Sequence, residues 1–310
     1  MSRRPRLASE VSAVRKTSVR SVTVRVPATS ANLGPGFDTL GLAYALYNTF
    51  TFECAERYEV LGCDERFRGD DNLALVAYRA ACERAGIVPV PVRLTIEADV
   101  PVSRGLGSSA TLLVGGVVGA KALLSLPLET ADLLELVNRM EGHPDNVAPA
   151  LLGGLTAAMQ RDGRPYVARL PLHPSYRFCA FIPDFETSTK EARAALPATV
   201  SHADAVFNVT RVATLIPALA NGDTALLRAA LDDRLHQPYR RALIHEFDDV
   251  HAAALAAGAE AFFIGGSGST LIAIYTADGF VERVREPIAR LSHHWRVLPL
   301  SPDTEGAKCL

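Results

Sequence analysis

The sequence has few features of a cross-linked, metal-clustered or membrane-embedded protein. Its 310 residues include five cysteines, an odd number, and no two of them have C-x-x-C spacing, which argues against a disulfide framework or a zinc site. The longest apolar stretch, residues 110–120, is followed by Lys121 and falls short of the ~20 apolar residues that a membrane span needs. We therefore expect a soluble protein of the reducing cytoplasm with no membrane partner.

An excess of charge of one sign is also missing. The 32 basic and 34 acidic side chains give a formal net charge of −2, so nothing predicts binding to nucleic acid or to an anionic membrane. Residues 1–20 carry several arginines but no apolar segment of a secretory signal, and we expect them to form a basic, flexible tail. The hydrophobic content of 48% is typical of a globular protein, and the length predicts one large or two medium domains.

Apolar periodicity predicts strands and helices in mixed order. In the first half, alternation predicts strands at 22–26, ended by Pro27, at 49–53 and at 92–97, and composition predicts a helix at 73–85. In the second half, the predicted strands are 178–182, 261–264, 270–275 and 295–298, and the predicted helices are 191–196, 203–220, 224–235, 246–257 and 280–291. Because strict βαβ alternation is missing, we expect an α+β fold with a boundary near residue 170.

A glycine- and serine-rich loop at residues 101–110 leads into an apolar helix that continues to Leu124. The first N–H groups of a helix have no partner and its dipole adds positive charge, so an oligophosphate can bind there. Gly105 and Gly107 permit close backbone approach, and the following serines can cap the helix, contact phosphate or reach a metal. The loop is neither a Walker A loop nor a dinucleotide fingerprint. An ordinary serine-capped helix is the alternative.

Three further turns carry polar side chains in apolar surroundings: residues 30–38, 141–146 and 265–270. Each is rich in glycine or proline, and ligand contacts are often found in such loops. The apolar face of residues 133–140 predicts a helix that ends at Glu141, immediately before the second turn. With the glycine-rich loop, these turns are the candidate functional segments.

These segments resemble the motifs of the GHMP small-molecule kinases, and within them the homoserine kinases. Residues 26–42 are similar to the first motif, residues 101–110 match the ATP loop P-x-x-x-G-L-G-S-S-A, and residues 141–154 are typical of the homoserine kinase members. Residues 265–270 depart from the usual S-G-A-G-P-T, with Gly265 in place of serine and Ser269 in place of proline among the departures. The resemblance implies an N-terminal ribosomal-protein-S5-like domain over 21–170 and a C-terminal ferredoxin-like α+β domain over 171–310.

The resemblance implies ATP-dependent phosphorylation of the L-homoserine side-chain hydroxyl to O-phospho-L-homoserine, in threonine biosynthesis, by a homodimer. ATP would be bound by Pro101, Val102, Ser103, Arg104, Gly105, Leu106, Gly107, Ser108, Ser109, Ala110, Thr111 and Asn72. Mg²⁺ would be held by Ser109 and Glu141, since this cation prefers oxygen ligands. The alternative for Asn72 is a helix cap, and for Glu141 a solvated carboxylate at a helix end.

The positions that match the amino-acid site of this family come from both halves of the chain: Asn32, Asp38, His143, Thr189, Arg193, Arg240 and Gly266. A carboxylate is bound well by arginine forks, for which Arg193 and Arg240 are candidates, and an ammonium group by a carboxylate, for which Asp38 is the candidate. Surface ion pairs are the alternative for the two arginines, and a structural hydrogen bond is the alternative for His143.

The candidate catalytic residues are Asp145, Asn146 and Arg193. Phosphoryl transfer passes through a loose transition state, so a strong general base is optional, and Asp145 and Asn146 fit a weak catalytic role or a structural one equally well. Two other functions stay open. One is a kinase for another alcohol such as mevalonate, but mevalonate lacks the ammonium group that Asp38 suits. The other is a catalytically silent sensor, which would have no need for both Ser109 and Glu141.

Overall fold

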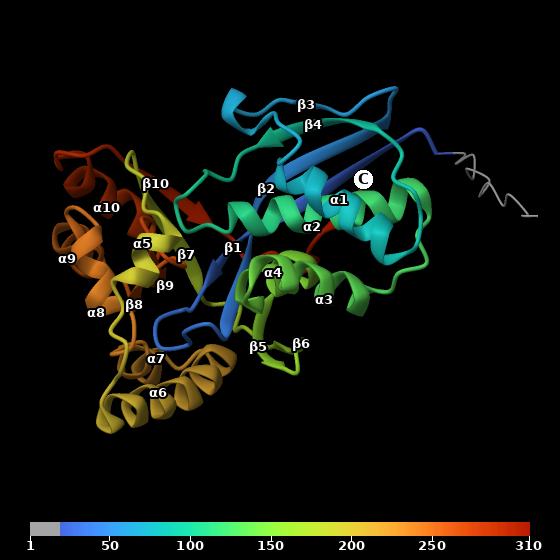
Figure 1. Cartoon of the computed structure of the whole chain (residues 1–310). Helices are drawn as coiled ribbons and strands as arrows, with labels where there is room; N and C mark the ends of the chain where they lie inside the picture. The colour runs from blue at the N-terminus through green and yellow to red at the C-terminus, as the bar shows by residue number, and fades with distance from the viewer. Residues whose placement is uncertain (1–18) are drawn as a thin grey trace, which may run out of the picture.

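The structure is a computed structural model that describes residues 19–310, so the predicted tail at 1–20 lies almost wholly outside it. Helices and two sheets are mixed along the chain, which confirms the α+β class (Figure 1). The strands are β1 (Ser21–Ala31), β2 (Leu40–Cys54), β3 (Glu59–Leu61), β4 (Val92–Ala98), β5 (Leu155–Arg161), β6 (Arg164–Leu170), β7 (Arg177–Pro183), β8 (Ala261–Ile264), β9 (Leu271–Tyr275), β10 (Trp295–Leu300) and β11 (Lys308–Cys309). The helices are α1 (Leu73–Arg84), α2 (Ser108–Leu124), α3 (Thr130–Glu141), α4 (Pro144–Leu152), α5 (Thr189–Ala194), α6 (His202–Asn221), α7 (Thr224–Ala230), α8 (Gln237–Arg240), α9 (Phe247–Ala256) and α10 (Phe280–Ala289), with 3-10 turns η1 (Glu65–Phe67) and η2 (Arg241–Leu243).

The first sheet is built on two long strands that the sequence predicted too short. Its order is β11-β1-β2-β4-β3, with β5 and β6 continuing from β2. The predicted end of β1 at Pro27 was wrong, because the register with β2 shifts between Pro27 and Ala28, and such a bulge accommodates proline inside a sheet. Strand β1 therefore continues to Ala31, and β2 begins at Leu40. The first motif therefore consists of the end of β1, a short turn and the start of β2.

Helices α1 to α4 lie side by side over one face of the first sheet (Figure 1). Helix α2 approaches its neighbours through glycines, because a Cβ atom at Gly115 or Gly119 would overlap the rings of Phe50 and Phe52 on β2. A Cβ atom at Gly116 would overlap the backbone carbonyl oxygen of Ala74 on α1. This close packing fixes the position of α2, and with it the glycine-rich loop at its N-terminus.

The second sheet has the order β10-β7-β9-β8 and is antiparallel throughout. Numbered along the chain, this is the 4-1-3-2 order of a β-α-β-β-α-β ferredoxin-like unit, as predicted. Side chains alternate across β7: Phe178 and Ala180 join a core with α6, α7 and the β1–β2 pair of the first sheet, whereas Cys179 and Phe181 pack against α9 and α10. One apolar core therefore connects the two sheets.

The chain passes from the first sheet to the second between Leu170, where β6 ends, and Arg177, where β7 begins. We propose residue 170 as the domain boundary on this ground. The division is not strict, since β11 at the end of the chain pairs with β1, and the backbone N–H of Asp303 donates to Ala43 on β2. The last residues therefore belong structurally to the first sheet.

Helix α6 is the one helix of residues 19–310 that is long and apolar enough to cross a membrane by length and composition. The sequence predicted this helix at 203–220 but not its suitability as a span, because only uninterrupted apolar runs were considered. In this structure Leu215 and Leu219 of α6 are buried in the core between the sheets, and Asn208 donates to the carbonyl of Pro35. The helix is thus packed as part of the folded domain.

Gly116→Ala should destabilise the protein although alanine favours helix. The added methyl group must displace the α1 backbone at Ala74, and overpacking of a close-packed core costs about 1–3 kcal/mol. Thermal unfolding measured by circular dichroism should show a lower melting temperature than that of the wild-type protein. An unchanged or raised melting temperature would contradict the close α1–α2 contact.

Candidate functional site

A cavity of about 470 Å³ lies where the predicted motifs of both halves meet. It brings together most of the predicted site residues, which come from seven separate stretches of the chain: Asn32, Asp38, Asn72, Val102, Ser103, Arg104, Gly105, Gly107, Ser108, Ser109, Glu141, His143, Asp145, Asn146, Thr189, Arg193, Arg240 and Gly266. Four residues of the predicted ATP loop, namely Pro101, Leu106, Ala110 and Thr111, do not line it. The cavity is therefore the candidate functional site.

The N-terminus of α2 opens on this cavity without a capping side chain. The predicted serine cap was wrong: the N-cap is Gly107, in a left-handed conformation with φ of 69°, and no side chain of the described residues caps the helix. Only glycine fits there, because a Cβ atom would overlap the hydroxyl oxygen of Thr29. The first-turn N–H groups and the positive end of the helix dipole are left for an anion.

The loop residues that do not line the cavity hold the loop in place. Leu106 is fully buried in the core, and its carbonyl accepts a 3.1 Å hydrogen bond from the backbone N–H of Thr29. The hydroxyl of Thr111 donates to the Ser108 carbonyl and accepts from the Asn48 amide, at 2.8 Å in both cases. Their side chains position the loop and do not face the cavity.

Helix α3 ends, as predicted, at Glu141 and brings its carboxylate to the start of α2. The hydroxyl of Ser109 donates to Glu141 Oε1 at 2.8 Å. Burial raises the pKa of Glu141, and the hydrogen bond from Ser109 opposes that shift. A partly desolvated carboxylate beside a hydroxyl is a pair of hard oxygen donors, and it fits a divalent cation such as Mg²⁺.

The predicted turn after Glu141 is instead the beginning of a helix, α4, with His143 as N-cap residue and Pro144 at its first position. Proline is favoured there because the first helical N–H needs no intrahelical acceptor. Within this turn His143 Nδ1 lies 2.5 Å from Asp145 Oδ1, and this bond is the main cause that raises the pKa of His143. Asn146 Oδ1 accepts a 2.9 Å hydrogen bond from the Thr29 hydroxyl.

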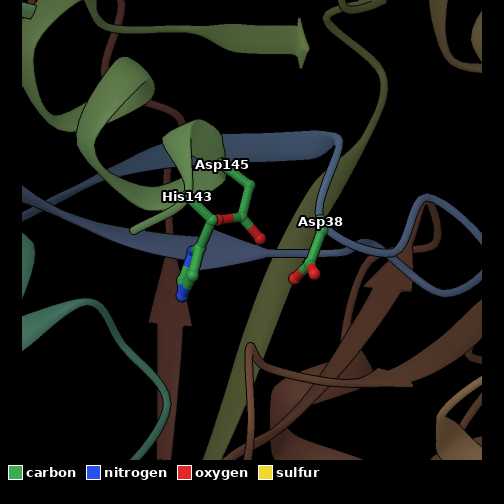
Figure 2. A group of neighbouring side chains, drawn as sticks. All are labelled: Asp38, His143 and Asp145. Atoms are coloured by element: carbon green, nitrogen blue, oxygen red, sulfur yellow. The ribbon is translucent and has the colours of Figure 1, made fainter. Parts of the chain in front are cut away.

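Asp38, His143 and Asp145 converge in the cavity (Figure 2). One ligating atom of each lies within 4.8 Å of the others, although Asp38 follows β1 and the other two residues begin α4. Asp145 is only 1% exposed, and its Oδ2 atom has no hydrogen-bond partner among the described residues. This group places two carboxylates and an imidazole together at one end of the cavity.

Two arginines from the second half stand beside these carboxylates and differ in their partners. The Arg193 guanidinium forms a bidentate pair with Asp38, with N–O distances of 2.9 and 3.1 Å. Arg240 is buried, at 2% exposure, and forms no ion pair with any residue between 19 and 310. Its Nε and Nη1 atoms donate to the carbonyls of Ala192 and Gly266, whereas Nη2 has no partner in that part of the chain.

The surface ion-pair alternative is therefore wrong for Arg240. Burial lowers the pKa of its guanidinium, and the positive charge of Arg193 adds to that shift. A buried cation without a counter-ion is costly unless an anion binds beside it. The Arg240 end of the cavity is thus suited to a carboxylate or another small anion.

Residues that the sequence analysis did not single out support the two arginines. The ring of Phe37 lies under both guanidinium groups, at 5.7 Å from Arg193 and 5.1 Å from Arg240, and it stacks on His236 at 5.0 Å. Burial lowers the pKa of His236 and keeps it neutral, so its Nε2–H donates to the Gly34 carbonyl and its Nδ1 accepts from Arg240. Phe37 lies within the first motif, but nothing in the sequence signalled His236.

The other end of the cavity has an apolar lining that was also missed: Cys63, Phe67, Leu73, Ile96, Ala98 and Leu112. Asn72 lies at this end, and both ends of its amide are used within the protein. Its Oδ1 accepts from the N–H of Ala74 at 3.0 Å, and its Nδ2 donates to the Phe67 carbonyl at 2.8 Å. The helix-cap interpretation of Asn72 is confirmed.

Arg104 of the loop binds the second half of the protein through its side chain. Its Nε and Nη2 donate to the carbonyls of Pro183 and Asp184, at 3.0 Å each, and its Nη1 lies 3.4 Å from the Glu186 carboxylate. With these partners the guanidinium is a tie between the loop and the end of β7. This differs from the direct nucleotide contact that the resemblance implies.

The loop at residues 265–270 packs against the glycine-rich loop despite its departures from the family pattern. The N–H of Thr270 donates to the Arg104 carbonyl at 3.0 Å, and a Cβ atom at Gly105 would overlap the Gly265 carbonyl oxygen. The Gly266 carbonyl accepts from Asn32 Nδ2 at 2.8 Å, while Asn32 Oδ1 accepts from the N–H of Asp38. The two loops therefore hold the first motif and Arg240 together.

Comparisons with known proteins agree with this geometry. A family model described as GHMP kinases N terminal domain matches residues 72–154, and one described as GHMP kinases C terminal matches residues 215–290. The homoserine kinase of Clostridium botulinum (strain Langeland) is 41% identical over 288 residues, which cover 92% of this chain and 97% of that protein. The homoserine kinase of Crocosphaera subtropica is 42% identical over 302 residues, which cover 93% and 97%.

A solved structure is similar over almost the whole chain. The crystal structure of homoserine kinase from Cytophaga hutchinsonii superposes with a TM-score of 0.86 at 29% identity, covering 95% of this chain and 99% of that one. The identity to the curated relatives, the two matched domains and this superposition agree with one another. The chain belongs to the GHMP kinase family and, within it, to the homoserine kinases.

Proposed function

We propose that this protein transfers the γ-phosphoryl group of ATP to the side-chain hydroxyl of L-homoserine and forms O-phospho-L-homoserine, on the route to threonine. One observation carries the proposal: a single cavity joins the uncapped N-terminus of α2 to the buried, unpaired Arg240 beside Asp38. The first end suits an oligophosphate. The second end presents positive and negative groups together, as a zwitterionic amino acid requires.

The nucleotide is assigned to the α2 end of the cavity. Its phosphates accept from the N–H groups of the loop and of the first turn of α2, where Gly105 and Gly107 allow close approach. Its base occupies the apolar part of the cavity, where Phe67, Leu73 and Ile96 offer flat and aliphatic surface. Asn72 shapes this part, since its amide already bonds to the protein.

Ser109 and Glu141 are the residues that would hold Mg²⁺. Their bonded oxygens and the partial burial of the carboxylate support this assignment. When bound, the cation neutralises phosphate charge, which is its main contribution to phosphoryl transfer. The protein side chains then have to orient the phosphates and the acceptor hydroxyl.

The amino acid is assigned to the Asp38 end. The free Nη2 of Arg240 and the adjacent guanidinium of Arg193 bind the α-carboxylate, and Asp38 accepts from the ammonium group. Asn32 and Gly266 hold Asp38 and Arg240 in position through their own hydrogen bonds. Thr189, whose hydroxyl lies 3.3 Å from that of Ser267, closes this end of the cavity.

The chemistry proposed here requires orientation and charge neutralisation more than proton abstraction. Asp145 is bonded to His143, and Asn146 is bonded to Thr29, so both are assigned a positioning role. The bond to Asp145 raises the pKa of His143, which favours its cationic form in the cavity, where negative charge must be stabilised. Arg193 serves in orientation of the substrate and in charge stabilisation.

The substrate assignment predicts turnover confined mainly to L-homoserine. Purified protein with Mg·ATP should release ADP with L-homoserine, and much more slowly with D-homoserine, L-serine, L-threonine, mevalonate or galactose, because these lack one of the matched groups or its geometry. Coupled ADP release measures this directly. A preference for mevalonate would keep the ATP site and overturn the amino-acid site, whereas ATP binding without any turnover would favour a sensor.

Glu141→Gln should lower kcat by at least ~100-fold, the usual scale for loss of a key electrostatic group, while the fold persists. The change keeps the size and polarity of the side chain and removes the charge that a divalent cation requires. Glu135→Gln is the matched control, since Glu135 lies on the same helix and pairs only with Arg139 at the surface. Near-normal turnover of the Glu141 variant over a range of Mg²⁺ concentrations would refute the assignment.

Arg240→Met should raise the KM for L-homoserine by roughly 30-fold or more and change the KM for ATP little. Loss of one partner of a buried charge pair costs about 2–5 kcal/mol in binding. Melting of the ligand-free variant should change little, because removal of a buried charge that forms no ion pair within residues 19–310 offsets the loss of its hydrogen bonds to Ala192 and Gly266. The neighbouring Arg241→Met, which breaks a surface pair with Asp248, is the control. Equal effects of Arg240→Met on both substrates would indicate a structural role.

A further inference from the structure

We propose that Thr187 is a ligand of the nucleotide phosphates, contributed to the ATP site by the second half of the chain. The proposal rests on the proposed function only in placing ATP in the cavity. Thr187 belongs to none of the matched motifs, and it lies in the segment 183–187 between the end of β7 and the start of α5. Three observations carry the inference: the docking of this segment, the free hydroxyl, and the local charge.

Segment 183–187 is docked on the phosphate loop along its length. Arg104 donates to the carbonyls of Pro183 and Asp184, and the backbone N–H of Thr187 donates to the Ser103 carbonyl at 3.4 Å. On its other side, the Ser269 hydroxyl donates to the Phe185 carbonyl at 2.8 Å. The segment is thus held between two loops of the site, and Thr187 lines the cavity beside Ser103.

The hydroxyl of Thr187 is not used by the part of the chain that the structure describes. The residue is 4% exposed, and its Oγ1 atom has no hydrogen-bond partner among the described residues. The next two hydroxyls are both engaged: Ser188 accepts from the N–H of Glu191, and Thr189 contacts Ser267. A buried hydroxyl without a partner is destabilising, so its position in a cavity wall points to a bond made with a ligand.

The surroundings of Thr187 favour a phosphate group as the hydrogen-bond acceptor of its hydroxyl. Its backbone N–H is bonded to Ser103, in the loop that leads to the N-terminus of α2. The neighbouring Glu186 is paired with Arg104 at 3.4 Å and with Arg66 at 3.5 Å, so its charge does not repel an anion. A threonine hydroxyl donates, and phosphate oxygens only accept, which makes the pair complementary.

Thr187→Val tests the assignment, because it removes the hydroxyl and keeps the β-branched shape. The probe is Mg·ATP, titrated calorimetrically into the ligand-free full-length protein without any amino acid. We expect Thr187→Val to bind Mg·ATP about tenfold or more weakly, as the loss of one hydrogen bond to a charged group implies. Thr187→Ser, which keeps the hydroxyl, should bind close to the wild-type value. The KM for L-homoserine should be unchanged in both variants.

Thermal unfolding of the ligand-free proteins separates ligand binding from a structural role. Because the hydroxyl has no partner without ligand, Thr187→Val should melt at the wild-type temperature or above it. Unchanged Mg·ATP affinity, a rise confined to the KM for L-homoserine, or a lower melting temperature with a parallel loss of affinity for both substrates would each overturn the proposal. Since ATP binding is measured alone, a wild-type protein that binds ATP but does not phosphorylate homoserine leaves this test intact.

Discussion

The guanidinium of Arg104 joins the phosphate loop to the second sheet, and the arrangement of the site depends on that tie. Its side chain is only 14% exposed and is bonded to two carbonyls and one carboxylate of the segment after β7. Its own carbonyl accepts from the loop at residues 265–270. The proposed nucleotide and amino-acid sites both use residues from the two halves of the chain. The two halves must therefore keep a fixed separation, because phosphoryl transfer tolerates little misplacement. Arg104 provides this constraint with donors that are already satisfied in the ligand-free protein.

The polar groups that remain unsatisfied mark where ligands fit. The N-terminus of α2 has no capping side chain, Arg240 is buried without a counter-ion, and the Thr187 hydroxyl has no partner in the described chain. Each lowers the stability of the ligand-free protein and can be satisfied by a bound group. The tightly bonded groups around them, such as Asn32, keep the free ones in place. On the proposed function, these groups lower the stability of the ligand-free protein and strengthen ligand binding.

Buried polar residues of the second half of the chain hold the side chains around Arg193 and Arg240 in place. Asp233 is buried and accepts from Asn208 and from the backbone at the start of α8, while Asn208 donates to Pro35 in the first motif. Neutral His236 continues this contact by stacking on Phe37, and it accepts from Arg240. The buried polar network is closely bonded, which favours a single orientation of the guanidinium groups. If the two arginines bind the substrate as proposed, its orientation depends on residues that do not touch it.

The sequence by itself determined the α+β class, the glycine-rich loop before a long helix, the helix that ends at Glu141 and the family, because periodicity, glycine placement and short motifs are local properties. It misjudged details where neighbours compete with local preference. Pro27 sits inside β1 because a bulge against β2 accepts it, and Gly107 replaces the expected serine cap because Thr29 leaves no room for a side chain. Only the tertiary structure decided that Arg104 ties the two sheets, and that Arg240 has no ion pair and the Thr187 hydroxyl no hydrogen-bond partner within residues 19–310. These facts depend on contacts between distant segments, and the core shared by the two sheets, rather than any local pattern, sets those contacts.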